Sequence, residues 1–152
     1  MRIKLFQEDA LEEDRTEIYY REMTEQIEKV CQLLEGSVPQ LFGLEDGEQI
    51  LLSLEEIFYI DTVDKKTFAY LKEHVYQIQG SLTFLESALS KHGFCRISKA
   101  NIVNIQHIKK VKSEANMRLK VVLNNQEELV ISRYYRKIFQ NYLKKVRGIL
   151  HD

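Results

Sequence analysis

The chain has 152 residues, of which 44% are hydrophobic and 30% are charged, and its formal net charge at pH 7 is -1. These values are typical of one globular domain with a core of its own, or of one domain with a small attachment, and they exclude a disordered chain. The first twenty residues are too acidic for a signal peptide, and no apolar run approaches the roughly 20 residues that span a bilayer. Cys31 and Cys95 lie far apart and predict neither a disulfide framework nor a zinc site, so we expect a cytoplasmic protein with reduced thiols.

The small net charge results from two oppositely charged parts of the chain. Residues 1–56 hold 5 basic and 15 acidic residues, whereas residues 57–152 hold 17 basic and 8 acidic ones. Within the second part, residues 91–147 carry 14 basic and only 3 acidic residues. A basic segment of this kind predicts a polyanionic partner. Charge alone equally allows an acidic and a basic solvated face that balance each other for solubility.

The first 39 residues predict a small acidic βα extension. Residues 1–6 alternate in polarity and predict a short strand. Thr16 is placed to cap a helix that runs to about residue 35, where Gly36 is a natural stop. The apolar positions of this helix recur every three or four residues: Tyr20, Met23, Ile27, Val30 and Leu34. Such a stripe must be buried, and we expect it to pack on the following domain or, as the alternative, on a second copy of the chain.

From residue 40 to the end at residue 152 we expect a separate, strand-rich domain with helices at its edges. Turn signals separate its expected strands, which are residues 41–44, 49–54, 57–62, 67–71, 75–79, 96–97, 102–105, 108–111, 118–123 and 128–132. Ser81 is placed to cap a short helix, and Asn124-Asn125 to form a hairpin turn, because asparagine tolerates positive φ. Ser132 is expected to cap a final helix whose buried stripe consists of Tyr135, Ile138, Tyr142 and Val146. The expected fold class is therefore α+β, mainly β.

The sequence offers little support for catalysis, and we expect no enzyme, no cofactor and no metal site. No phosphate-binding glycine loop or hydrolase motif occurs, and no pair has metal-ligand spacing among the histidines, which are His74, His92, His107 and His151. Asp61 and Asp64 resemble a pair of catalytic carboxylates, but we expect Asp61 at a strand end and Asp64 in a turn beside Lys65 and Lys66, where a solvated turn is the better explanation. Cys95 lies between apolar and basic neighbours and is expected to be a small core residue rather than a nucleophile.

Two segments place polar and basic residues within otherwise apolar, β-prone sequence. They are Phe94–Asn104, which reads FCRISKANIVN, and Ile131–Tyr135, which reads ISRYY. Basic side chains there and in the turn at residues 64–66 could contact DNA from loops, because phosphate contacts supply affinity and register. Arg133 is the sharpest candidate, since it follows a serine at a helix start, where free N–H groups favour a phosphate, and its guanidinium could read guanine. The alternative for Arg133 is a surface ion pair with a nearby carboxylate.

Taken together, these segments resemble the two signatures of the LytTR (LytR/AlgR-type) family of bacterial DNA-binding domains. The family pattern is roughly F-x-R-[IC]-[HS]-[RK]-S-x-[IL]-V-N, followed later by [IV]-S-R-x-Y. The likeness covers about residues 40–147 and implies an elongated stack of small β-sheets with a short helix and a C-terminal helix. It also implies that edge loops, rather than a helix-turn-helix, enter successive major grooves of tandem repeats, usually in a dimer. Ser98 replaces the family's frequent histidine, Ala100 its serine and Asn125 the glycine of its hairpin turn, which removes one base contact from the first loop.

Carried over by position, the resemblance implies DNA contacts by Ser98 and Lys99, by Ser132 and Arg133, and by Lys65 or Lys66. With the neighbouring polar residues of the same segments, the predicted DNA-binding residues are Lys65, Lys66, Ser98, Lys99, Asn101, Arg133, Tyr134 and Arg136. Asn104 closes the first motif, where we expect it to satisfy backbone groups, with a base contact as the alternative.

The resemblance also bears on the regulation of the protein. Residues 1–39 are too few for the phosphate-receiving domain that many LytTR regulators carry. The chain therefore resembles the stand-alone LytTR regulators of Firmicutes, which have a short N-terminal extension and are often encoded beside a small inhibitory membrane protein. The predicted function is that of a sequence-specific transcription regulator that binds double-stranded DNA as a homodimer. The alternative is a protein-interaction module that does not bind DNA and acts through the acidic N-terminal helix.

Overall fold

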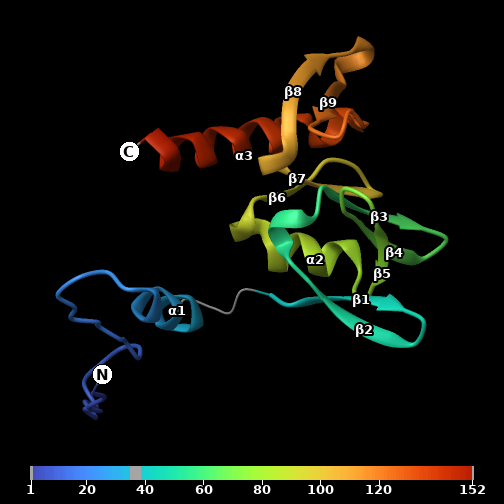
Figure 1. Ribbon diagram of the computed structural model, residues 1–152. Helices are drawn as coiled ribbons and strands as arrows, with labels where there is room; N and C mark the ends of the chain where they lie inside the picture. The colour runs from blue at the N-terminus through green and yellow to red at the C-terminus, as the bar shows by residue number, and fades with distance from the viewer. Residues whose placement is uncertain (1, 35–38, 152) are drawn as a thin grey trace. The chain divides into compact units, whose positions relative to one another are not determined.

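The computed structural model describes residues 2–34 and 39–151, and the chain divides into two compact units, residues 1–37 and 38–152. In its described residues the first unit contains α1 (Glu25–Leu34), and residues 2–24 form neither helix nor strand. In its described residues the second unit contains ten strands and the α-helices α2 (Leu82–Leu89) and α3 (Arg133–His151). Figure 1 shows these elements in chain order from blue to red.

Two predictions for the first unit are wrong. Residues 2–6 form no strand, since the unit offers no second segment to pair with their backbone groups; Met1 lies outside the described residues. The helix begins at Glu25 because Thr24, rather than Thr16, caps it: the Ile27 N–H donates to Thr24 Oγ1 at 3.3 Å. Glu25 and Glu28 in the first turn complement the helix dipole. Tyr20 and Met23 therefore precede the helix, and the predicted stop at residues 35 and 36 lies outside the described residues.

Two antiparallel sheets build the second unit, which is α+β and mainly β as predicted. The larger sheet has the order β2-β1-β5-β4-β3-β7-β6, and its strands are β1 (Leu41–Glu45), β2 (Glu48–Leu52), β3 (Tyr59–Val63), β4 (Lys66–Tyr70), β5 (Val75–Ile78), β6 (Phe94–Arg96) and β7 (Asn101–Asn104). The smaller sheet has the order β10-β9-β8, with β8 (Ile108–Ser113), β9 (Leu119–Leu123) and β10 (Glu128–Ile131). The pairing of β3 with β7 is the long-range step that brings the candidate loops together.

The core lies on both faces of the larger sheet because successive residues of its strands point to opposite sides. Ile60 packs with Leu85 and Leu89 of α2, whereas the adjacent Tyr59 packs with the smaller sheet and with Phe139 of α3. In Figure 1, α2 accordingly lies on one side of β6 and β7, and α3 with β8 and β9 lies on the other. The predicted cap of α2 is confirmed, since the Phe84 N–H donates to Ser81 Oγ at 3.1 Å.

The predicted β9–β10 hairpin across Asn124-Asn125 is confirmed, but two finer expectations in this unit are wrong for identifiable reasons. In the β9–β10 turn the residue with positive φ is Gln126 (φ 73°), and neither asparagine takes that conformation. The turn is a three-residue loop, closed by the Leu123 N–H on the Glu127 carbonyl at 2.8 Å, and Asn125 uses its side chain to accept from the Glu127 N–H at 3.1 Å. In α3 the fully buried residue is Phe139, whereas Ile138 is exposed, because helical spacing allows either position to continue the stripe from Tyr135.

Candidate nucleic-acid interface

Three loops that are far apart in the sequence meet at one end of the larger sheet. The Ser132 N–H, just before α3, donates to the Ile97 carbonyl at 3.0 Å and so joins the two signature segments. The Thr62 N–H, near the end of β3, donates to the Ala100 carbonyl at 3.0 Å and joins the β3–β4 hairpin to the β6–β7 loop. These two bonds therefore bring the β3–β4 hairpin, the β6–β7 loop and the start of α3 next to one another.

The β3–β4 turn presents Lys65 and Lys66, both of which are exposed. Asp64 (φ 50°) and Lys65 (φ 64°) form a two-residue turn between the paired residues Val63 and Lys66, which is the type I′ geometry that favours asparagine or aspartate followed by glycine. Lys65 thus has a left-handed backbone without being glycine, a conformation that costs about 1 kcal/mol. Such strain at an exposed lysine agrees with a functional role for its side chain.

The β6–β7 loop carries Lys99 at its exposed tip. The N–H groups of Ile97 and Ser98 both donate to the Asn101 carbonyl, at 3.0 and 3.4 Å, and the Ala100 N–H donates to Ser98 Oγ at 3.2 Å. Ser98 is half-buried, so its hydroxyl oxygen shapes the loop while its proton remains able to donate. Asn101 opens β7, opposite Asp61 of β3, and is also half-buried.

A polar hollow of about 660 Å³ lies between these two loops and the start of α2. Lys65 and Lys66 line it on one side, Lys99 and Arg96 on another, and the hydroxyl-bearing residues of the β5–α2 region close it. None of the ion pairs among the described residues involves Lys65, Lys66 or Lys99. The hollow therefore offers cations that protein carboxylates do not neutralise, which suits a polyanion.

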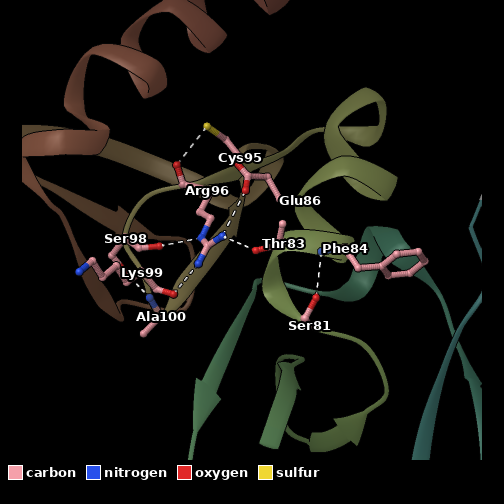
Figure 2. A network of polar contacts seen from close by, with 9 residues as sticks. All are labelled: Ser81, Thr83, Phe84, Glu86, Cys95, Arg96, Ser98, Lys99 and Ala100. Atoms are coloured by element: carbon pink, nitrogen blue, oxygen red, sulfur yellow. Dashed lines mark hydrogen bonds and ion pairs between the residues drawn. The ribbon is translucent and has the colours of Figure 1, made fainter. Parts of the chain in front are cut away.

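Arg96 is the residue of this region that the sequence reasoning left out. Its side chain is only 13% exposed and lies beneath the β6–β7 loop, where Nε donates to the Ser98 carbonyl at 3.1 Å and Nη2 to the Lys99 carbonyl at 2.7 Å. Figure 2 shows the same guanidinium bonded to Glu86 and Thr83 of α2. The signal was present in the sequence as the arginine of the F-x-R motif, but a motif does not separate a buried arginine from a DNA-facing one.

The start of α3 presents Arg133 and Tyr134, which are both exposed. The Ser132 carbonyl accepts from the N–H groups of Tyr135 and Arg136, both at 3.0 Å, so that serine occupies the position just before the helix as predicted. Tyr134 is 75% exposed and meets the Tyr135 ring edge-on, with centroids 4.9 Å apart. Arg136 is half-buried. Among the described residues no carboxylate forms an ion pair with Arg133, so the ion-pair alternative is not observed.

Asn104 is structural, as expected, and its base-contact alternative is excluded by burial. The side chain is 1% exposed, and its Nδ2 donates to the carbonyls of Ile57, at 2.9 Å, and Leu54, at 3.4 Å. Its Oδ1 accepts from the Gln106 N–H at 3.1 Å. All these partners are backbone groups, and the Leu54 carbonyl also accepts from the Ile57 N–H at 3.2 Å.

The structure also tests the predictions for Cys95 and for the two carboxylates, Asp61 and Asp64. Cys95 is buried, as predicted, and burial raises the pKa of its thiol to about 12, so it stays a neutral core residue. Asp64 is exposed in the β3–β4 turn as predicted, whereas Asp61 lies within β3, is half-buried and accepts from the Tyr70 hydroxyl at 2.9 Å. Burial raises the pKa of the Asp61 carboxyl, because desolvation disfavours its charged form.

Within the described ranges, no group of three or more His, Cys, Asp or Glu side chains is arranged to hold a metal ion. No helix in that part of the chain is both long enough and apolar enough to cross a membrane.

Comparison with known proteins points to the same region. The family model of the LytTr DNA-binding domain matches residues 47–144. The sensory transduction protein LytT of Bacillus cereus is 24% identical over 132 residues, covering 87% of this chain, and the chain spans about half of it, 49%. A Staphylococcus aureus protein named an uncharacterized HTH-type transcriptional regulator is 24% identical over 145 residues, covering 94% of this chain and 98% of its own length. The solved LytTr DNA-binding domain of a Bacillus cereus response regulator superimposes with a TM-score of 0.65 at 25% identity, covering 68% of this chain and 95% of that domain.

Proposed function

The chain belongs to the LytTR family of DNA-binding domains, and we propose that it is a non-enzymatic transcription regulator that recognises a specific DNA sequence. Its basic edge loops enter successive major grooves of tandem repeats, and the protein binds them as a homodimer in the cytoplasm. The observation that carries this proposal is the convergence of three loops with exposed cations at one end of the larger sheet. In the described part of the chain, strands separate each α-helix from the next, which fits recognition by loops.

The positions of the side chains suggest which residues contact bases and which contact phosphates. Arg133 is exposed at a helix start, where its planar fork can pair with guanine O6 and N7. Lys99 projects from a loop of fixed shape and provides a second contact in the groove, beside Ser98. Lys65 and Lys66 contribute charge to the phosphate backbone from an exposed turn that lines the hollow.

The remaining predicted residues have supporting parts in this proposal. Tyr134 offers an exposed ring and hydroxyl next to Arg133. Arg136 lies one turn further along α3 and can reach a flanking phosphate. Asn101 stands at the base of the Lys99 loop, where its amide can contact a base or a phosphate.

We also propose that residues 1–39 form an extension that regulates residues 40–152 without touching DNA. The extension is acidic, and such a surface repels phosphates within a Debye length of about 10 Å. Its Ile3, Leu5 and Phe6 are 83%, 92% and 78% exposed, which favours a protein partner for this segment. A second copy of the chain or an inhibitory membrane protein would satisfy that requirement. The competing proposal, a protein-interaction module without DNA binding, rests on the same exposed residues.

A mobility-shift titration decides between these proposals. The probe is duplex DNA from upstream of the protein's own gene, with a scrambled duplex of equal length and composition as the control. We expect tighter binding to the upstream duplex, and a version of the chain starting near Gln40 that keeps this preference with weaker cooperativity. If the parent protein binds both duplexes equally, and an enriched random-sequence pool yields no preferred duplex either, the regulator proposal is wrong. If the version starting near Gln40 folds but loses all preference, the extension takes part in DNA binding.

A further inference from the structure

We infer that Arg96 is a positioning residue for DNA recognition: its guanidinium sets the shape of the Ser98–Ala100 loop and thereby aims Lys99. This inference rests on the proposed function. It assigns to Arg96 a role in DNA recognition that requires no contact between Arg96 and the DNA groove. Arg96 lies under the loop with its side chain 13% exposed and contributes through the backbone it holds.

The first step of the argument is how Arg96 holds the loop. Two of its nitrogens donate to consecutive carbonyls, of Ser98 at 3.1 Å and of Lys99 at 2.7 Å. Charged donors make stronger bonds than neutral ones, and a bidentate grip fixes direction as well as distance. With both carbonyls drawn inward to Arg96, the peptide planes on either side of Lys99 cannot rotate. The Cα–Cβ bond of the exposed Lys99 is therefore held in one direction, which sets where its side chain can reach.

The second step is what holds Arg96. Its Nη1 donates to Glu86 Oε2 at 3.2 Å and to Thr83 Oγ1 at 3.4 Å, both on α2. This helix is a firm anchor because Ser81 caps it and Leu85 is fully buried beneath it. The Lys99 loop is thus tied through one side chain to a buried helix, as Figure 2 shows.

The third step is a link to the other candidate reader of DNA. The Arg96 Cζ lies 5.9 Å from the centroid of the Tyr135 ring, in the first turn of α3, within the range of a cation–π contact. The Ser132 N–H bond to the Ile97 carbonyl lies in the same region. Arg96 is therefore near enough to influence Arg133 as well, and an experiment must separate the two routes.

Lysine cannot replace arginine in this role, because an ammonium is a point charge without the planar fork that reaches two carbonyls and a carboxylate together. We expect Arg96→Lys to lower affinity for the preferred duplex about tenfold, which corresponds to the loss of about one charge-assisted hydrogen bond. Affinity for the scrambled duplex should fall by less than about twofold, since the net charge is unchanged.

A double-mutant cycle tests whether Arg96 acts through Lys99. In a Lys99→Ala background the effect of Arg96→Lys on the preferred duplex should shrink to about twofold or less, because the contact that Arg96 positions is already gone. In an Arg133→Ala background the same substitution should keep its full effect. Thermal unfolding, measured for every variant, reports any purely structural cost, which would be equal in both backgrounds. Lys72→Ala is the matched control for Lys99→Ala. Lys72 is an exposed lysine in the turn between β4 and β5, and so follows the end of β4 that is opposite to the Lys65 turn.

If Arg96→Lys does not fold, Glu86 supplies the second pair of variants. Glu86→Gln keeps an oxygen that accepts from Arg96 Nη1, whereas Glu86→Ala removes it and leaves the loop anchor loose. We expect the alanine variant to lose several-fold in affinity for the preferred duplex and the glutamine variant to bind nearly as the parent does.

The outcomes separate the inference from the function on which it rests. A parent protein with no preferred duplex overturns both. A parent with a preference that Arg96→Lys or Glu86→Ala leaves intact overturns the positioning role alone. The effect of Arg96→Lys on affinity could instead persist in the Lys99→Ala background and vanish in the Arg133→Ala background. That result would show that Arg96 positions Arg133 at the start of α3 and not Lys99.

Discussion

Two neighbouring regions of the larger sheet present lysines to the same hollow by different physical means. The β6–β7 region is pinned by side chains at both ends, by Arg96 under its loop and by Asn104 at the end of β7. The β3–β4 turn is held by the backbone ladder that pairs Val63 with Lys66, and it requires Lys65 to adopt a left-handed conformation. A buried polar network holds a loop in one backbone geometry. A strained two-residue turn fixes the register of its two strands but costs conformational free energy. The first arrangement suits a contact that reads a base, and the second suits one that supplies charge.

The largest effect should come from breaking the pinned region at its buried end. Asn104→Ala removes the donor to the Ile57 carbonyl and the acceptor for the Gln106 N–H, whereas the Leu54 carbonyl keeps its bond from the Ile57 N–H. Leaving buried backbone groups unsatisfied costs about 1–3 kcal/mol each, so we expect the free energy of unfolding to fall by about 2–4 kcal/mol. Urea denaturation followed by circular dichroism measures this loss. A decrease below about 1 kcal/mol would mean that water replaces the amide and that the pinning is weak.

The next largest effect on DNA binding is expected at Arg133, the proposed guanine-contacting residue, which belongs to neither region. Arg133→Lys keeps the charge but loses the planar fork, and a bidentate arginine–guanine contact is worth about 1–3 kcal/mol of discrimination. We expect binding to the preferred duplex to weaken by that amount while binding to scrambled DNA changes little, with no change in thermal stability because the site is an exposed helix start. Titrations of both duplexes at one salt concentration measure it. Equal losses on both duplexes would make Arg133 a phosphate clamp.

The two regions also differ in how far the sequence could predict them. The β1–β2 turn and the cap of α2 were predictable, because Asp46-Gly47 and Ser81 act within a few residues of the chain. The meeting of the loops was not, since it depends on β3 pairing with β7 across about forty residues, which the printed sequence does not encode locally. The role of Arg96 was hidden for the same reason, because its anchor Glu86 lies on another element. Residues 2–24 show the opposite case, because local polarity patterns predicted a strand and the start of a helix there and the described structure contains neither.

A third variant measures the electrostatic share of the pinned loop. Lys99→Ala should weaken binding to all DNA and reduce the slope of log affinity against log salt by about one counterion, because the exposed ammonium has no protein carboxylate as a partner in the described ion pairs. The preferred duplex should lose more affinity than the scrambled one, since the loop is held in one shape. Titrations at three or more salt concentrations give both quantities, and identical slopes for variant and parent would contradict a phosphate contact.

In the strained β3–β4 turn, we expect one substitution to raise the free energy of unfolding and to lower DNA affinity. Lys65→Gly relieves the left-handed lysine and should raise the free energy of unfolding by about 0.5–1 kcal/mol, while it removes one cation and lowers DNA affinity a few-fold. Lys66→Gly is the matched control, because Lys66 has ordinary strand geometry on β4 and its replacement should lower both quantities. Thermal unfolding and a DNA titration on the two variants test the pair. A loss of stability in Lys65→Gly would show that the turn is not under strain.

The smallest effect lies where the two regions touch, at Asp61 of β3 opposite Asn101 of β7. Burial raises the pKa of the Asp61 carboxyl, and one of its oxygens, Oδ1, is buried with no partner among the described groups. The folded protein therefore binds this proton more tightly than the unfolded chain does, whose aspartate pKa is about 3.9. Stability from this group is present at low pH and declines as pH rises from about 4 through the raised folded pKa.

Asp61→Asn removes that decline and keeps an oxygen to accept from the Tyr70 hydroxyl. We therefore expect the stability of the variant relative to the parent to increase as pH rises through this window and then to stay constant up to neutral pH. The other carboxylates contribute equally to both proteins, so the difference isolates Asp61. Denaturation of both proteins between about pH 4 and pH 7 supplies the measurement, with Asp64→Asn as the control because Asp64 is exposed in the turn. A difference that does not change with pH would show that the Asp61 carboxylate is solvated in the folded protein, and that the junction between the pinned and the strained regions carries no electrostatic cost.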